Sequence, residues 1–324
     1  MAYLARRLGF YALAAWASMT LNFFLPRLMP GDPASAIFAR FQGKMDPSAI
    51  DAMRKSYGLS DQPLIYQYFS YINAILHGNF GTSISFFPSP VTHVIRQGLA
   101  WTLLLGLVSV ILSFLIGSVL GVLGAWRRSG VSDNVLPPLL IFVGSFPYFW
   151  LASFLLFVLG FQHNVFPLRH AYADGLQMGW TWGFVQSVGY HLVLPATTII
   201  LVTIGGWMLG MRNAMISVLS EDYMTMAEAK GLPQRRIMFN YAARNALLPN
   251  ITAFGMALGF VISGALLTET VFSYPGLGWQ LITAVRQLDY PLMQGIFLMI
   301  TFAVLGANFI VDLLYLRLDP RVRA

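Results

Sequence analysis

Six long apolar segments limit how this chain can fold more than any other feature of its sequence. They lie near residues 8–29, 99–126, 135–161, 188–211, 248–270 and 293–316. An α-helix crosses the hydrocarbon core of a bilayer with about 20 residues, so each segment is long enough to span a membrane. Only 10% of the 324 residues are charged, whereas soluble domains carry roughly 25%. The sequence therefore predicts an all-α integral membrane protein with about six transmembrane helices.

The third segment contains three prolines, Pro137, Pro138 and Pro147. A proline inside a helix removes a backbone hydrogen bond and clashes with the preceding turn. We therefore expect the span over 135–161 to be kinked, with freed backbone carbonyl groups near its middle.

Arginine and lysine residues predict the orientation of the chain in the membrane. If the N-terminus is cytoplasmic, the inner segments hold Arg6, Arg7, Arg127, Arg128, Arg212, Lys230, Arg235, Arg236, Arg244, Arg317, Arg321 and Arg323. The short outer loops then hold only Arg169 and Arg286. Because cytoplasmic loops carry the excess of basic residues, both termini are expected to be cytoplasmic. This pattern also accounts for the formal net charge of +7, so no nucleic acid partner is expected.

The first segment also resembles a secretory signal, since Arg6 and Arg7 precede an apolar run. The run is as long as a full span, however, and Asn22 and Arg27 occupy the region where small residues would mark a cleavage site. We therefore predict an uncleaved first span. The resulting division is a cytoplasmic stub and first span at 1–29, an extracytoplasmic loop at 30–98, and a transmembrane core at 99–324 with a cytoplasmic loop at 212–249.

The outer loop is predicted to be helical. One helix is expected to begin at Asp46-Pro47-Ser48 and end before Gly58, and a second to run from Asp61-Gln62-Pro63 to Gly78. The apolar stripe of the second helix comprises Tyr66, Phe69, Ile72, Ile75 and Leu76. Two interpretations remain open: the stripe packs the loop against the spans, or it docks an outside partner that delivers substrate.

The inner loop contains signals for a short rigid helix. Ser220 is expected to cap its start, with Glu221 and Asp222 in the first turn, where the helix dipole is positive. Gly231 stands where a helix ends in the left-handed conformation, and Pro233 follows. Such a helix, held outside the membrane between spans, can dock into a groove on a partner.

Ionisable residues are scarce inside the predicted spans, which argues against an ion-coupled carrier. The middles of the first three spans contain no charged side chain, and His191 lies near the outer start of the fourth. Asp312, near the inner end of the sixth span, is expected to pair with Arg317. Glu269, near the outer end of the fifth, is expected either to line a transport path or to form a hydrogen bond at a helix end.

The chain lacks the residues that most enzyme classes need. It has no GxxxxGK(S/T) phosphate-binding loop, so it is not expected to hydrolyse ATP itself. It has no cysteine, which excludes thiolate metal sites and cysteine nucleophiles. His163, His170 and Asp174 have no matching ligand set nearby, so neither a metal nor another cofactor is expected in this chain.

Eleven short motifs in chain order resemble the B-type permease subunit of the ABC importers for dipeptides, oligopeptides, nickel and some oligosaccharides. They are Met29-Pro30-Gly31-Asp32-Pro33, Tyr57-Gly58-Leu59, Gln62-Pro63-Leu64, Gln67-Tyr68, Gly78-Asn79-Phe80-Gly81-Thr82-Ser83, Phe146-Pro147-Tyr148-Phe149-Trp150, Phe166-Pro167-Leu168-Arg169, His191-Leu192-Val193-Leu194-Pro195, ETVFSYPGLG at 269–278, and Asp289-Tyr290-Pro291 with a terminal Leu318-Asp319-Pro320-Arg321. The resemblance covers nearly the whole chain and implies the type I ABC importer permease fold.

The resemblance also implies an assembly in a bacterial or archaeal cytoplasmic membrane. The expected partners are a second, homologous permease, two ATP-binding subunits that hold ATP and Mg²⁺, an extracytoplasmic solute-binding protein and the lipid bilayer. The inner loop is similar to the family's ATPase-coupling "EAA" loop, which implies coupling roles for Asp222, Tyr223, Ala227, Glu228, Ala229, Lys230, Gly231 and Arg235. Peptide permeases usually have a sequence close to RTARAKG there, whereas this chain has MTMAEAKG at 224–231.

Two further expectations concern the spans and the cargo. Small residues form ridges at Gly255, Gly259 and Ser263 and at Gly117 and Gly121, expected either to pack within this chain or to meet the second permease. The expected translocation path comprises Ser145, Phe146, Tyr148, Phe149, Trp150 and Glu269. The cargo is expected to be oligopeptides or oligosaccharides. Nickel is disfavoured, because the spans offer hardly any histidine or carboxylate ligands.

Overall fold

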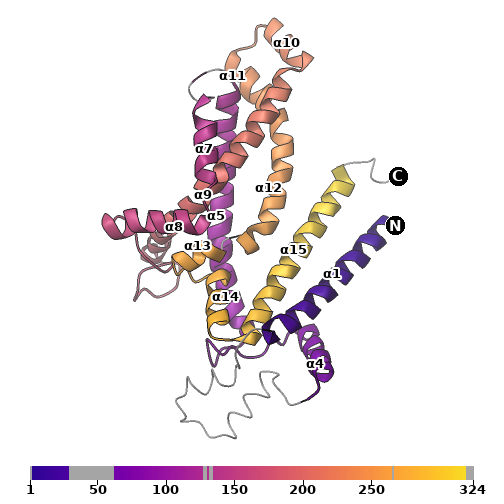
Figure 1. The fold of residues 1–324 in the computed structure, drawn as a ribbon. Helices are drawn as coiled ribbons and strands as arrows, with labels where there is room; N and C mark the ends of the chain where they lie inside the picture. Colours follow the sequence, from indigo (N-terminus) through magenta and orange to yellow (C-terminus); the bar gives the residue numbers. More distant parts are fainter. Residues whose placement is uncertain (1, 29–61, 127–129, 131–133, 265, 319–324) are drawn as a thin grey trace. The chain divides into compact units, whose positions relative to one another are not determined.

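The structure is a computed structural model that describes residues 2–28, 62–126, 130, 134–264 and 266–318. Their regular structure is helical apart from one isolated antiparallel bridge between Thr82 and Pro90 (Figure 1). The elements are α1 (Ala2–Arg27), α4 (Leu64–Leu76), α5 (Val91–Trp126), α7 (Leu136–Gly144), α8 (Tyr148–Leu155), the π-helix η1 (Leu156–Gln162), α9 (Trp182–Leu219), α10 (Asp222–Ala229), α11 (Gln234–Arg236), the π-helix η2 (Ile237–Ala243), α12 (Arg244–Gly264), α13 (Leu266–Val271), α14 (Leu277–Arg286) and α15 (Tyr290–Leu318). The all-α prediction is confirmed.

Four of the described helices are long and apolar enough to cross a membrane. They are α1 over Arg6–Leu25, α5, α9 and α15 over Tyr290–Ile310, and the bent pair formed by α7 and α8–η1 is a fifth candidate. The predicted span at 248–270 falls on α12 and α13. A multi-pass helical membrane protein is therefore confirmed, while the number of six spans stays a prediction. The first predicted outer-loop helix, at 46–58, lies outside the described residues, as do the side chains of the predicted pair Asp312 and Arg317.

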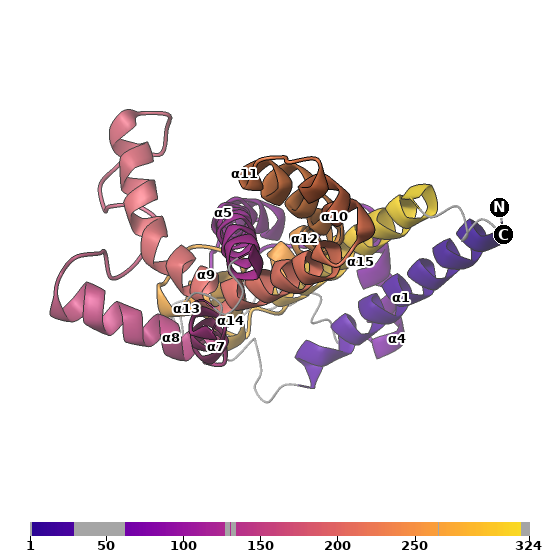
Figure 2. The same ribbon diagram turned by 90° about the horizontal axis from the view of Figure 1, so that it is seen from above.

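The third predicted span is two helices that meet at a sharp bend. α7 and α8–η1 are bent by 99° relative to each other, and Figure 2 shows α8 running away from α7. Pro147 is the N-cap residue of α8, so the bend at this proline is confirmed. Pro137 and Pro138 do not bend the helix. They lie in the first turn of α7, where backbone N–H groups have no intrahelical acceptor. The kink predicted within 135–161 is therefore confirmed, and that this segment forms one broken span stays a prediction.

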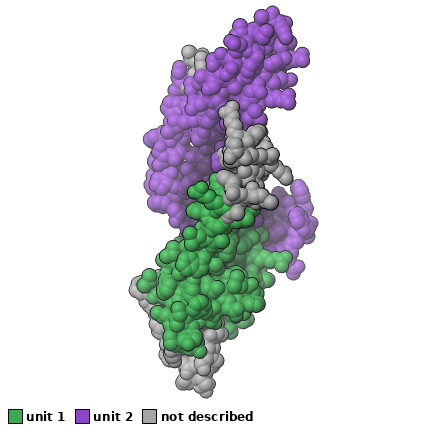
Figure 3. Space-filling model, turned by 90° about the vertical axis from the view of Figure 1, so that its right-hand side faces the viewer, with its two compact units in different colours: residues 1–102, 275–324 green, residues 103–274 purple. Residues whose placement is uncertain are grey.

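The described residues belong to two compact units (Figure 3). The first comprises Met1–Thr102 and Pro275–Ala324. In it α1 lies beside α15, and hydrogen bonds join α14 to the start of α5. The backbone N–H of Leu277 donates to Oγ1 of Thr102 (2.8 Å), and Nε2 of Gln280 donates to the carbonyl of Val94 (2.9 Å).

The second unit, Leu103–Tyr274, contains α7 to α13 and most of α5. Glycines let α5 approach α9 closely: a Cβ atom on Gly117 would lie 2.6 Å from Cβ of Trp207, and one on Gly121 would lie 2.6 Å from the carbonyl oxygen of Met208. This small-residue ridge therefore packs within the chain, which confirms that interpretation for Gly117 and Gly121. In the other ridge, a Cβ atom on Gly255 would have no described atom within 4 Å.

Candidate functional site

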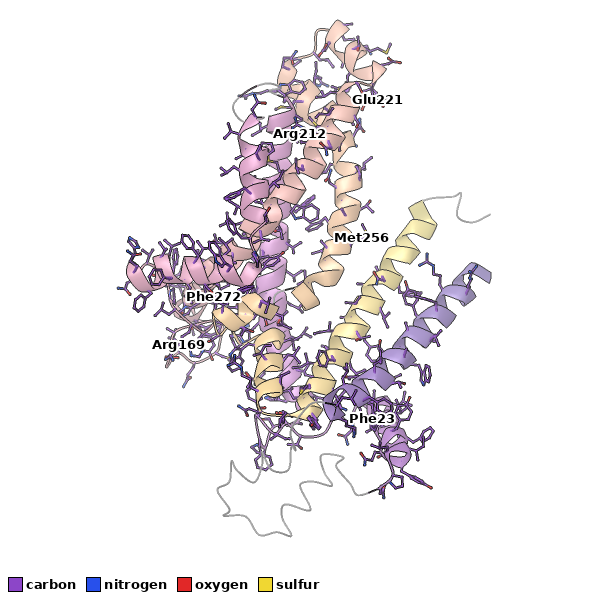
Figure 4. The ribbon with its side chains drawn as sticks, viewed as in Figure 1. Phe23, Arg169, Arg212, Glu221, Met256 and Phe272 are labelled. Carbon is purple, nitrogen blue, oxygen red and sulfur yellow. The ribbon has the colours of Figure 1, made fainter. Side chains whose placement is uncertain are left out.

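The short helix predicted in the inner loop is α10, at the tip of the second unit beyond α9 (Figure 1). Glu221, labelled in Figure 4, is its N-cap residue and Asp222 lies in its first turn. The predicted cap at Ser220 was wrong. α9 continues to Leu219, and the Ser220 hydroxyl donates to the carbonyl of Ser217 at 2.7 Å. Ser220 therefore ends α9 instead of starting α10.

Gly231 ends α10 as predicted. Its φ angle is +68°, in the left-handed region where a side chain is strained. The N–H of Gly231 donates to the carbonyl of Glu228 (2.9 Å), and the N–H of Leu232 donates to the carbonyl of Ala227 (3.4 Å). These two bonds form a Schellman motif, which satisfies the last carbonyl groups of the helix. The chain then restarts as a helix after Pro233.

One side of α10 is buried in an apolar cluster that we call the tip core. α10 contributes Met224 and Ala227, each 3% exposed. The other members come from the ends of α5, α9 and α12 and from η2: Val122, Ala125, Met211, Met215, Ile237, Met238, Ala242 and Ala246. Because protein cores are close-packed, a displacement of α10 is transmitted to all of these helices.

The predicted coupling residues divide into two groups. Asp222, Tyr223, Glu228, Ala229, Lys230, Gly231 and Arg235 are exposed at the tip. Ala227 is buried in the tip core, so it supports α10 and is not available for contact with a partner. The Tyr223 hydroxyl accepts a hydrogen bond from Nδ2 of Asn245 (3.1 Å).

Two exposed apolar residues at the tip were not predicted. Met226 is 64% exposed and Phe239, on η2, is 51% exposed. The signal for Met226 was its spacing. Met226 follows the buried Met224 by two residues, which corresponds to a rotation of about 200° around the helix axis. Its side chain therefore lies on the side of α10 that faces away from the tip core. Nothing in the local sequence marks Phe239.

The predicted path residues of the third span lie at the junction of α7 and α8. The rings of Phe146 and Trp150 stack across the break with centroids 4.7 Å apart, and Trp150 stacks on Phe154 at 5.7 Å. Phe142 extends this aromatic cluster, because its ring meets that of Phe146 edge to face with centroids 5.2 Å apart. Phe142 and Phe154 were not predicted, although the spacing of four residues along a helix would have found them.

The other predicted residues of this group surround the stack. Ser145, Phe149 and Trp150 are exposed, while Phe146 and Tyr148 are half-buried. The Ser145 hydroxyl donates to the carbonyl of Ile141 (2.8 Å). The exposed members therefore offer an apolar, aromatic surface with few polar groups.

Glu269 is on a helix, α13, that packs against α8. It is fully buried. Its backbone carbonyl accepts a hydrogen bond from the N–H of Tyr274 at 2.8 Å. Burial, and then the neighbouring Glu269, raise the pKa of the Tyr274 hydroxyl. Of the two interpretations, this position favours a bond at a helix end over direct contact with cargo.

These features define a multi-pass helical membrane permease with a short, partly exposed helix in the loop after α9. The chain belongs to the family of binding-protein-dependent transport system inner membrane components, whose sequence profile matches residues 117–324. The matched region contains α10 and most of the second unit. The chain is thus a permease subunit of an ABC importer and not itself an enzyme.

Individual relatives match over almost their full length. The probable D,D-dipeptide transport system permease protein DdpB of Escherichia coli (strain K12) is 36% identical over 93% of this chain and 92% of that protein. The dipeptide transport system permease protein DppB of Lactococcus lactis subsp. cremoris (strain MG1363) is 32% identical over 99% of both chains. The oligopeptide transport system permease protein AppB of Bacillus subtilis (strain 168) is 34% identical over 93% of both chains.

Proposed function

We propose that this chain forms half of the translocation path of an ATP-driven peptide importer and receives mechanical work through α10. The observation that carries the proposal is the combination of an exposed tip with a buried anchor. Met226 and the charged side chains around it are free to meet a partner, while Met224 and Ala227 fix the same helix to α5, α9 and α12.

In this mechanism α10 docks into a cleft of an ATP-binding subunit on the cytoplasmic side, as the distribution of basic residues predicts. ATP and Mg²⁺ are held by two such subunits. When they close on ATP, the docked helix moves, and the tip core carries the displacement into α5, α9 and α12. Rigid-body rocking of this kind, together with a second permease, produces alternating access.

Peptides are the favoured cargo. The relatives described above are named for D,D-dipeptides, dipeptides and oligopeptides, and none of these three names supports the oligosaccharide alternative. A solute-binding protein delivers the peptide, which then passes the exposed aromatic stack at the junction of α7 and α8. Apolar ring faces suit side chains of varied shape, so selection rests with the binding protein.

The proposal is tested by transport into proteoliposomes that contain this chain, a second permease and the two ATP-binding subunits, with binding protein outside. We expect labelled dipeptide uptake to require ATP inside and to be inhibited by unlabelled peptides but not by oligosaccharides. A collapsed ion gradient is expected to leave uptake unchanged. Uptake driven by an ion gradient without ATP would contradict the coupling assignment, and inhibition by oligosaccharides alone would contradict the cargo.

A further inference from the structure

Helix α4 has an apolar face that the described part of the chain does not cover. Ile65, Phe69 and Leu76 are 58%, 63% and 73% exposed. Together with the half-buried Ile72 they follow the spacing of four, three and four residues that makes a single stripe on a helix. Of the two interpretations left open for the apolar residues of this helix, packing against the spans does not hold for Phe69 and Leu76 within the described part of the chain.

A different face of α4 packs on α1. The hydroxyl groups of Tyr68 and Thr20 are 2.8 Å apart, and Nδ2 of Asn22 donates to the Tyr71 hydroxyl at 3.2 Å. The ring of Phe23, labelled in Figure 4, lies 5.4 Å from each of these tyrosine rings. Tyr68 and Tyr71, which combine ring contacts with hydrogen bonds, thus form the face of α4 that packs on α1.

These contacts fix the level of α4 along the predicted span. Thr20 is five residues before the end of the apolar part of α1, at Leu25, which corresponds to about 8 Å of helix. Arg27 lies just beyond that end. Its guanidinium group sits 3.7 Å from the centre of the Phe23 ring and donates to Oε1 of Gln67 at 3.3 Å. Arginine at the end of a span keeps its charge at the membrane surface. α4 is therefore held at the boundary between hydrocarbon and water.

The sides of α4 differ in chemistry. Its sequence, LIYQYFSYINAIL, contains no charged residue. The side away from both α1 and the stripe carries the exposed polar residue Ser70. In the same turns of α1, Leu21 and Leu25 are also exposed, and a bilayer covers such side chains on a spanning helix. The uncovered stripe of α4 thus belongs to a helix that packs on the part of α1 whose exposed leucines a bilayer would cover.

We propose that α4 is an interfacial helix whose Ile65–Phe69–Leu76 stripe is buried in the lipid leaflet at the Arg27 end of α1. Helices of this kind insert their apolar face about 5–10 Å into the boundary between headgroups and acyl chains. Tyrosine is enriched at that depth because it combines an apolar ring with a polar hydroxyl. A neutral apolar stripe offers no charge complementarity to a soluble partner, which favours lipid over a docking protein.

The chain has no cysteine, so single-cysteine variants report one position each. We would label Phe69→Cys with an environment-sensitive fluorophore in lipid nanodiscs, and compare it with the matched control Ser70→Cys. At position 69 we expect quenching by lipids with brominated acyl chains to exceed quenching at position 70 at least threefold, with the order reversed for aqueous iodide. Since no transport is measured, failure here leaves the proposed function untouched.

Three results would overturn the interfacial assignment. Equal iodide quenching at positions 69 and 70 would place the stripe in water. Resistance of position 69 to both quenchers would mean that protein covers it. Protection of position 69 only after a solute-binding protein is added would identify a docking surface for that protein instead.

Discussion

The hydroxyl of Ser83 donates a 2.5 Å hydrogen bond to Oδ2 of Asp289, a side chain 206 residues further along the chain that is fully buried. The same oxygen accepts a bond from the backbone N–H of Ser85 (2.8 Å). Oδ1 accepts from the N–H of Leu292 (3.1 Å) and so caps the start of α15. One carboxylate therefore joins the segment before α5 to the first turn of α15.

We predict that Asp289→Asn destabilises the protein. An amide has one acceptor oxygen in place of two, so at least one buried donor loses its partner, which costs about 1–3 kcal/mol. The midpoint of thermal unfolding in detergent is expected to fall. Asp174→Asn is the matched control, since Asp174 pairs with Arg169 at an exposed site (77% and 67% exposed), where ion pairs contribute about 0–1 kcal/mol. Equal midpoints for the two variants would contradict the structural role of Asp289.

We predict that Gly231→Asp abolishes peptide uptake and uncouples the ATPase while the protein still inserts into the membrane. A side chain at φ +68° is strained by roughly 1–2 kcal/mol, and it lies at the proposed docking surface. Gly175→Asp is the control: that glycine also has a positive φ, +86°, with open space around it, but it lies in the loop before α9. Uptake and ATP hydrolysis are measured in the same proteoliposomes. Normal uptake by the Gly231 variant would refute the assignment of α10.

The two methionines of α10 are predicted to act differently. Met224→Ala removes a buried side chain from the tip core, and a substitution of this kind costs about 2–5 kcal/mol, so the unfolding midpoint is expected to fall. Met226→Ala removes an exposed side chain. It is expected to leave stability unchanged and to weaken binding of the ATP-binding subunit about 5- to 30-fold, which corresponds to about 1–2 kcal/mol at an interface. If Met226→Ala binds that subunit normally, Met226 is not part of the interface.

The stop at Gly231 and the restart after Pro233 were predictable because both depend on conformational limits of single residues. The long-range arrangements were not. Nothing near Ser83 in the sequence indicates Asp289 as its partner. In α4 the apolar pattern predicted a helix but did not show that Tyr68 and Tyr71 would contact α1, through hydrogen bonds that Phe69 cannot form. Ser220 was assigned to the wrong helix because α9 extends eight residues beyond the predicted end at 211.

Trp150→Ala is predicted to change the rate of transport more than its selectivity. Trp150 stacks between Phe146 and Phe154 and is about half exposed, so its ring offers apolar contact without hydrogen bonds that would distinguish one cargo from another. Uptake of one labelled dipeptide, with a panel of unlabelled peptides as competitors, measures both properties. Phe161→Ala, on the exposed side of η1, is the control for loss of an aromatic side chain. A changed order of competitors would show that Trp150 selects cargo.

The approach of α5 to α9 provides a last prediction, in which two glycine substitutions have opposite effects. In Gly121→Ala the new Cβ would lie 2.6 Å from the backbone oxygen of Met208 and 2.8 Å from Cβ of Met211. Backbone cannot yield as a flexible side chain can, so the helices must separate, at a cost of about 1–3 kcal/mol. In Gly206→Ala, on α9, nothing lies within 4 Å of the new atom, and alanine favours a helix over glycine by about 1 kcal/mol. The unfolding midpoint is expected to fall for Gly121→Ala and to hold or rise for Gly206→Ala. Because Met211 also belongs to the tip core, Gly121→Ala should further lower the amount of peptide transported per ATP hydrolysed, and an unchanged ratio would mean that α5 and α9 need not move together.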